Sequence, residues 1–230
     1  MLHLTSRPRF IIAVMRKRIT VLHLVLFSAA VLFAAEAKLE TLPAFSGEGV
    51  PPAVAKALEP QGYRVVLPDS VCELWFRSGL VSSENKGAGG DVLYPQLASS
   101  TFLGVIRVAK GLSDFRGQPI KPGTYSLRYE LLPEDGNHLG VSPNRDFLLL
   151  VPASADPNPN AAMGPEDLAK LSNRASGTNH PALLSLTSAD QSAFPSVSAN
   201  AEGFTVLSVK LKMSAGELPM AVIVKGTAPQ

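Results

Sequence analysis

Residues 124–131 read TYSLRYEL, and they alternate between apolar and polar side chains without a fault. One set of alternate positions holds only Tyr and Leu, and the other holds Thr, Ser, Arg and Glu. This alternation predicts a β-strand with one face packed on a core and the other facing water. Residues 207–213, LSVKLKM, repeat the pattern and predict a second strand of the same kind.

Further strands are expected at Tyr63–Leu67, Val71–Arg77, Phe102–Ala109, Phe147–Val151, Leu183–Thr187 and Met220–Lys225. Residues 147–151 are apolar throughout, which indicates a strand in the middle of a sheet and covered on both faces. Lys121-Pro122-Gly123 predicts a type II turn, and Arg116-Gly117 and Asp135-Gly136 predict other turns. Short strands separated by Gly and Pro predict a mainly β fold, an antiparallel β-sandwich of jelly-roll-like kind with one or two short helices.

Two short helices are expected, at Pro52–Leu58 and Pro165–Arg174. The second has Pro in its first turn, acidic residues beside the positive end of its dipole, and Gly177 to end it. Polar or Gly- and Pro-rich composition predicts loops at Ser82–Gly90, Asp156–Asn160 and Ser188–Gly203. We therefore divide the chain into a leader at 1–37, an N-terminal extension at 38–60, the main β-sandwich region at 61–155, and a linker, helix and strands at 156–230 that complete the same domain.

The composition is that of a globular domain. The 230 residues are 46% hydrophobic and 17% charged, which argues against a disordered chain or a coiled coil. The single cysteine, Cys72, excludes a disulfide framework and any multi-cysteine metal site. Cys72 is expected to be a small buried apolar residue, and an intermolecular disulfide is the alternative.

The N-terminal segment has the three parts of a secretory signal peptide. Arg16-Lys17-Arg18 is basic, an apolar run follows from Ile19 to Ala35, and Ala35-Glu36-Ala37 offers small residues at both cleavage positions. We expect cleavage after Ala37 and a periplasmic or extracellular protein. The alternative is a retained membrane anchor, although a run of this length is at the lower end of the spanning range. Met15 directly before the basic triplet is an alternative start.

Removal of residues 1–37 changes the charge of the chain. It takes away five basic residues and one acidic residue, which leaves 16 basic against 18 acidic and a net charge of −2. Nucleic-acid binding depends on basic residues that displace counterions from phosphates. Nucleic acid is therefore excluded as a partner, and a membrane is a partner only if the leader is retained.

Several catalytic motifs are absent from the sequence. It has no G-x-S-x-G elbow, no HExxH and no Walker A loop. Residues 87–90, GAGG, superficially resemble a phosphate-binding loop, but DVLYP follows them instead of the start of a helix. We expect a flexible hairpin there.

The main polar concentration lies at Glu134–Asp146, between two predicted strands. Its candidate binding residues are Asp135, Asn137, His138, Arg145 and Asp146. Asp135, His138 and Asp146 could ligate a divalent metal, or an aspartate could orient His138 for proton transfer. The alternative is an elaborate hairpin with local hydrogen bonds, and therefore no cofactor. His180, before Pro181, is expected to be a surface or capping residue; whether the two histidines meet cannot be read from the sequence.

Aromatic residues suggest a different kind of site. In the predicted strand at 71–77, Trp75 would lie on the face opposite Cys72, Leu74 and Phe76. If that face is exposed, Trp75 with Tyr63 or Tyr94 would form a stacking platform for a sugar or peptide. If both faces are covered, Trp75 is part of the core.

The stretch GQPIKPGTYSL at 117–127, together with DGNHLG at 135–140, Ser142-Pro143 and DFLLLVP at 146–152, resembles a group of secreted bacterial β-sandwich proteins to which no activity is assigned. The resemblance covers about residues 100–157. It implies a bacterial, extracytoplasmic β-sandwich and lends no catalytic residue.

These observations favour a non-enzymatic exported module that binds a small ligand, a glycan or a protein. The alternative is a metal-binding protein or metal-dependent enzyme centred on Asp135, His138 and Asp146. Fold class cannot rank the two, because β-sandwiches have many unrelated functions.

Overall fold

The structure is a computed structural model that describes residues 36–83, 91–133, 135, 138, 140–189 and 193–227. All of them belong to one compact unit, Ala34–Gln230. Most of the expected signal peptide, the GAGG segment at 87–90 and Asn137 lie outside the described residues. Within the described residues, no helix combines the length and the apolar character needed to cross a bilayer.

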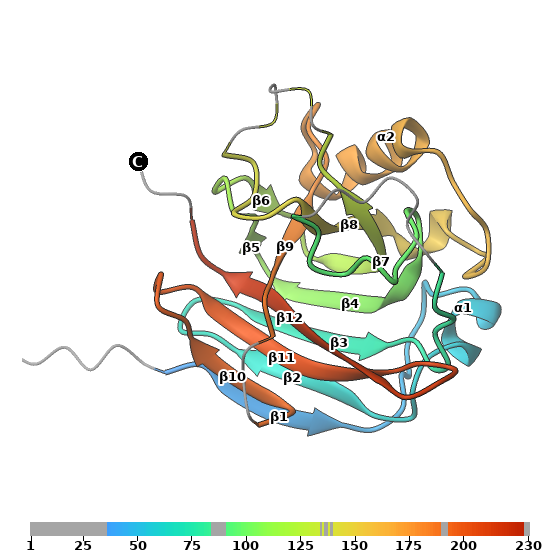
Figure 1. The fold of residues 1–230 in the computed structure, drawn as a ribbon, viewed down its shortest axis with the longest axis horizontal. Helices are drawn as coiled ribbons and strands as arrows, with labels where there is room; N and C mark the ends of the chain where they lie inside the picture. Colours follow the sequence, from blue (N-terminus) through green and yellow to red (C-terminus); the bar gives the residue numbers. More distant parts are fainter. Residues whose placement is uncertain are drawn as a thin grey trace, which may run out of the picture. The chain divides into compact units, whose positions relative to one another are not determined.

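The fold is mainly β, as the alternating segments predict (Figure 1). The strands are β1 (Lys38–Leu42), β2 (Gly62–Val66), β3 (Val71–Phe76), β4 (Phe102–Lys110), β5 (Leu112–Ser113), β6 (Pro119–Ile120), β7 (Gly123–Leu131), β8 (Asp146–Pro152), β9 (Leu183–Thr187), β10 (Ser196–Ala199), β11 (Thr205–Lys212) and β12 (Glu217–Lys225). Ten of these described strands form one antiparallel sheet in the order β1-β2-β3-β4-β7-β8-β9-β12-β11-β10. β5 and β6 form a separate small hairpin.

The sheet curls until it is nearly closed into a barrel-like shape. From β1 to β9 consecutive strands of the sheet are neighbours; helix α1 (Pro52–Lys56), the β5–β6 hairpin and helix α2 (Pro165–Ser176) are inserted between them. Strands β10, β11 and β12 then form a Greek-key excursion that places β12 beside β9. The two edge strands, β1 and β10, contact each other. Neither edge strand was expected, and β10 lies within the predicted loop at 188–203.

Apolar side chains from the strands fill the inside of the curled sheet. They form one large cluster that includes Leu74, Leu127, Leu150 and Val222. Cys72 is fully buried in this cluster, which confirms its expected role as a small apolar core residue. Burial raises the pKa of its thiol to about 12, because a thiolate would lose its hydration there.

Three smaller clusters cover parts of the outer face of the sheet. Helix α1 (Pro52–Lys56) packs over β3 and β4, and helix α2 (Pro165–Ser176) packs over β8 and β9 (Figure 1). α2 ends at Gly177, whose φ of 73° is left-handed, as predicted for the residue that ends this helix. Residues 147–151 are therefore covered on both faces, which confirms that prediction.

The polar face of β7 is buried, so the prediction that it faces water was wrong. Arg128 is 1% exposed, and Ser126 and Glu130 are buried beside it. Its guanidinium forms two bonds to Asp156, of 2.6 and 2.9 Å, and donates to the carbonyl oxygens of Ser100, Asn158 and Ala161. The segment 156–161 has no regular structure, as predicted, but the ion pair with Asp156 and the bonds to the carbonyls of Asn158 and Ala161 hold it against β7.

The predicted type II turn at 121–123 was also wrong. Gly123 does not have a positive φ and is instead the first residue of β7. The positive φ occurs at Gly117, at 80°, and the N–H of Gly117 donates to the carbonyl of Asp114 across a turn. The Pro122-Gly123 pair therefore lies where the loop ends and β7 begins, and the tight turn of that loop is at Gly117.

Candidate ligand-binding cavity

A cavity of about 500 Å³ lies on the outer face of the sheet. Its apolar lining comes from β7 to β9 and the loops next to them, with Leu131, Leu132, Val141, Phe147, Leu149 and Leu183. The first half of α2 adds Ala169 to the lining. Two other cavities, of about 270 and 300 Å³, are smaller and more polar in character.

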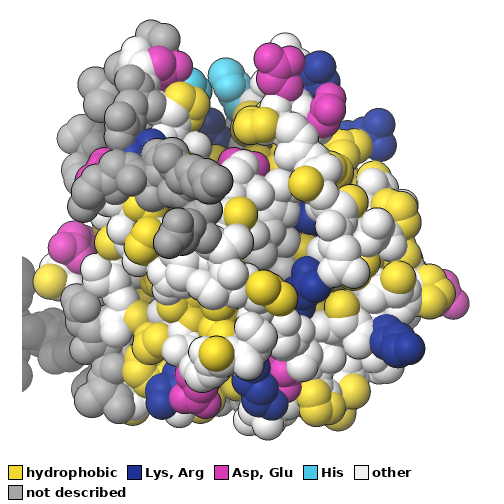
Figure 2. Space-filling model, turned by 45° about the vertical axis from the view of Figure 1, so that its right-hand side comes forward, with side chains coloured by type: hydrophobic (Ala, Val, Ile, Leu, Met, Phe, Trp, Pro, Cys, Tyr) yellow, Lys and Arg dark blue, Asp and Glu magenta, His cyan; other side chains and the backbone are white. Residues whose placement is uncertain are grey.

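Five residues with titratable side chains line the same cavity: Arg116, Glu130, His138, Glu166 and His180. They come from the β5–β6 loop, β7, the loop after β7, α2 and the loop before β9. His138 and His180, 42 residues apart in the sequence, therefore line one cavity. Figure 2 shows histidine side chains near the top of one face, among acidic and hydrophobic side chains.

A buried carboxylate holds the β5–β6 loop that carries Arg116. Asp114 is 1% exposed, and its Oδ1 accepts the backbone N–H groups of Arg116 and Gln118 at 3.0 and 2.9 Å. Its Oδ2 accepts from Arg116 Nη2 and Nε at 2.7 and 3.2 Å, and from the Gln118 amide. Because one carboxylate binds both backbone and side chain, the loop and the guanidinium are fixed together.

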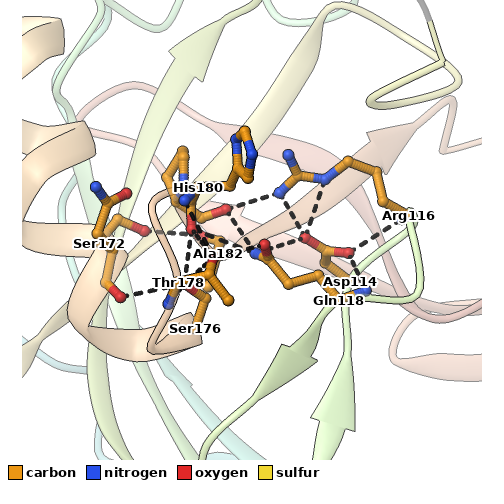
Figure 3. Close-up of polar contacts among 10 residues, drawn as sticks. Asp114, Arg116, Gln118, Ser172, Ser176, Thr178, His180 and Ala182 are labelled. Atoms are coloured by element: carbon orange, nitrogen blue, oxygen red, sulfur yellow. Dashed lines mark hydrogen bonds and ion pairs between the residues drawn. The ribbon is translucent and has the colours of Figure 1, made fainter.

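The same network fixes the loop that carries His180 (Figure 3). Arg116 Nη2 and the Gln118 amide donate to the carbonyl of Pro181 at 2.8 and 3.1 Å. Ser176 Oγ, at the end of α2, donates to the carbonyl of His180 at 2.6 Å, and Thr178 Oγ1 donates to Gln118. These bonds use the backbone of His180, and Figure 3 shows its imidazole pointing away from the network.

Glu130 is the buried acid of the cavity. It is 4% exposed, and Ser99 Oγ lies 2.7 Å from each of its carboxyl oxygens. Burial raises the pKa of Glu130 and outweighs the hydrogen bonds, which act in the opposite direction. The carboxyl group is therefore easier to protonate than an ordinary glutamate, and in that form it can donate a hydrogen bond.

The candidate site predicted from the loop at 134–146 is not assembled as a metal site. Asp135 and His138 do meet, with 2.9 Å between Oδ1 and Nδ1. Asp146 is instead fully buried, where it accepts the N–H groups of Leu93 and Tyr94 and the hydroxyl of Tyr129. Among the described residues, Asp135, His138 and Asp146 do not form a group able to hold a metal ion.

Two other predicted site residues have structural contacts. Arg145 binds Asp91 at 3.0 Å and donates to the carbonyl of Leu132, so its side chain tethers the loop before β8. Asp146 pins residues 93–94 to the start of β8, and its contact contributes, after burial, to the raised pKa of Tyr129. Asn137 lies outside the described residues.

Trp75 is on the face of β3 opposite Cys72, as the alternation along the strand predicts, but that face is covered by other residues. Its side chain is 3% exposed, its Nε1 donates to the carbonyl of Pro43 at 2.9 Å, and Phe45 packs edge-on at 5.0 Å. Tyr94 is also buried. The exposed face that a stacking platform requires is therefore not present at Trp75.

The cavity residues that sequence reasoning missed are Arg116, Glu130 and Glu166. The sequence places Arg116 in a predicted turn, and it predicts Glu130 on the water-facing side of β7. Nothing local to their sequence indicates that loops from distant parts of the chain will close over them.

Comparison with known proteins does not assign the chain to a protein family or functional class. No protein-family model matches the chain, and no curated protein or solved structure matches it.

Proposed function

We propose that the protein is a non-enzymatic, exported binding module whose cavity takes up a small, predominantly apolar molecule. The observation that carries the proposal is the 500 Å³ cavity with its apolar lining and few polar groups. This volume lies within the range of about 300–1,000 Å³ that is usual for small-molecule sites. The buried polar network of Asp114 makes two of its walls rigid before any ligand binds.

The chemistry of the lining supports binding more than catalysis. The described residues that line the cavity include no serine, threonine or cysteine, so they offer no hydroxyl or thiol nucleophile next to the histidines. Arg116 binds Asp114, His138 binds Asp135, and Glu130 binds Ser99. These contacts orient the polar groups at the edge of an apolar surface, as ligand recognition requires.

Export is the second part of the proposal. The basic triplet, apolar run and A-x-A site at 16–37 support it, as does the resemblance to secreted bacterial β-sandwich proteins. β1 begins at Lys38, so a cut after Ala37 would leave every described strand in the mature chain.

An uncharged fluorescent probe tests the binding function. N-phenyl-1-naphthylamine should bind the exported protein saturably, with the rise in emission that follows its transfer from water to an apolar site. Ala169→Trp fills the cavity from α2 and should weaken binding about tenfold or more. The matched control, Lys170→Trp, places the same side chain at an exposed neighbouring position and should leave the affinity unchanged. No saturable binding, or equal binding by both variants, would contradict the proposal.

A further inference from the structure

We infer that the cavity prefers a ligand with a carboxylate on its apolar body, and that Arg116 and His180 recognise this group. The inference rests on the proposed function and adds the class of ligand to it.

Arg116 has donors that the described residues leave unused. Its Nε and Nη2 bind Asp114, and Nη2 also donates to Pro181, whereas Nη1 makes no hydrogen bond to a described residue. Figure 3 shows Nη1 without a dashed line. The side chain is only 23% exposed, so a group bound there is partly removed from water. Guanidinium N–H groups that are fixed in one plane are suited to carboxylate oxygens.

Asp114 does not cancel the charge of Arg116 completely. Its two oxygens accept two backbone N–H groups and the Gln118 amide in addition to the guanidinium. The negative charge is therefore shared among several donors, and the side of the guanidinium away from Asp114 keeps a positive potential.

His180 provides the second polar group at this end of the cavity. Its backbone is held by Ser176 and Gln118, while its ring makes no hydrogen bond to a described residue. In Figure 3 the ring lies on the same side of the network as Nη1 of Arg116. An imidazole N–H next to a guanidinium can donate to the second oxygen of one carboxylate.

The acidic groups of the cavity do not oppose an anion strongly. Burial raises the pKa of Glu130, so a nearby carboxylate favours the protonated form that can donate a hydrogen bond. The side chain of Glu166 is 92% exposed, where water and salt screen its charge. The apolar surface of Phe147, Leu149 and Leu183 then remains for the body of the ligand.

Three probes with one chain length and different head groups test the inference. Octanoate, octanol and octylamine are each used to displace N-phenyl-1-naphthylamine from the full exported protein near pH 7. Octanoate should displace it at about tenfold lower concentration than octanol, and octylamine should be the weakest. Equal displacement by octanoate and octanol would overturn the inference.

Two variants test whether His180 and Arg116 are responsible for the preference for octanoate over octanol. His180→Ala removes only a ring without hydrogen bonds to the described residues, and Arg116→Gln removes Nη1; each should reduce the advantage of octanoate over octanol to about twofold. The affinity for octanol shows whether the Arg116 variant keeps its cavity. Arg174→Gln, exposed on α2 and outside the lining, is the control and should keep the full advantage.

The outcomes separate the two proposals. If the fluorescent probe binds but both variants keep the octanoate advantage, the carboxylate inference fails and the binding function stands. If the fluorescent probe does not bind the wild-type protein, the binding function and the inference both fail.

Discussion

Replacing Arg128 with methionine tests whether the buried ion pair on β7 stabilises the fold as its contacts indicate. Methionine keeps a long side chain but removes the guanidinium that binds Asp156 and three carbonyl oxygens. The side chain of Asp156 is 2% exposed and would become an unpaired buried carboxylate. Removing one partner of a buried ion pair costs about 3–5 kcal/mol, and the carbonyls left without donors place this case toward the upper end.

Urea unfolding of the purified protein provides the measurement. The only tryptophan, Trp75, is buried in an outer cluster, so its emission should report unfolding. Arg128→Met should lower the free energy of unfolding by about 4 kcal/mol, whereas the control Arg64→Met removes a solvent-screened surface charge and should lower it far less. Arg64 is 40% exposed, and its partner Glu73 keeps a 3.0 Å contact with Arg107.

A double variant separates the charge from the packing. Arg128→Met with Asp156→Leu removes both charges, so it should be more stable than Arg128→Met alone. A loss below about 1 kcal/mol for Arg128→Met, or a double variant less stable than the single one, would refute the reasoning.

Three other results are expected. Folding raises the pKa of Glu130 above its ordinary value of 4.5, so ionisation of this carboxyl group favours the unfolded chain. The stability of the protein should therefore fall as the pH rises from about 4.5 through the pKa of the folded state. Glu130→Gln should therefore gain stability relative to wild type between about pH 4 and pH 8 in urea unfolding; a constant difference would contradict this. Cys72 should not react with Ellman's reagent in the native protein and should react fully in urea, because its thiol is buried and its pKa is about 12. The intact mass of the protein produced from the full-length sequence should match a chain that begins at Lys38, and a mass that includes residues 15–37 would indicate a retained anchor instead.

The strands were predictable wherever their pattern was long and regular. β7, β8, β9 and β11 were expected within one or two residues of their ends, because alternation and apolar runs are local properties. Their inward faces were also predicted, as Tyr125 and Leu127 show by their place in the inner cluster. Helix α2 was predictable from Pro165 and Gly177 for the same reason.

The edge strands were not predictable in this way. β1 and β10 have five and four residues, and their side chains are mostly exposed or half-buried. Such segments have little apolar pattern of their own, because each is a strand only by pairing with β2 or β11. Whether these segments form strands therefore depends on partners that lie farther along the sequence or across a turn.

The candidate site likewise includes features that the sequence predicted and features that only the folded structure decided. The polar residues of the loop at 134–146 were recognisable, and Asp135 and His138 do contact each other. Asp146 was assigned to that group only because it is near in sequence, whereas the structure turns it toward Tyr129 and residues 93–94. The direction of a side chain at the start of a strand depends on which elements pack beside it.

The sequence by itself determined the antiparallel β class, the position of α2 and the features of an export signal, because these follow from periodicity, turn residues and composition along one segment. Only the tertiary structure decided that the outer face of β7 is buried, that Trp75 is covered, and that His138, His180 and Arg116 line one cavity. These outcomes depend on loops that close over the sheet from distant parts of the chain. The contacts that hold them, such as those of Asp156 and Asp114, exist only once the chain has folded.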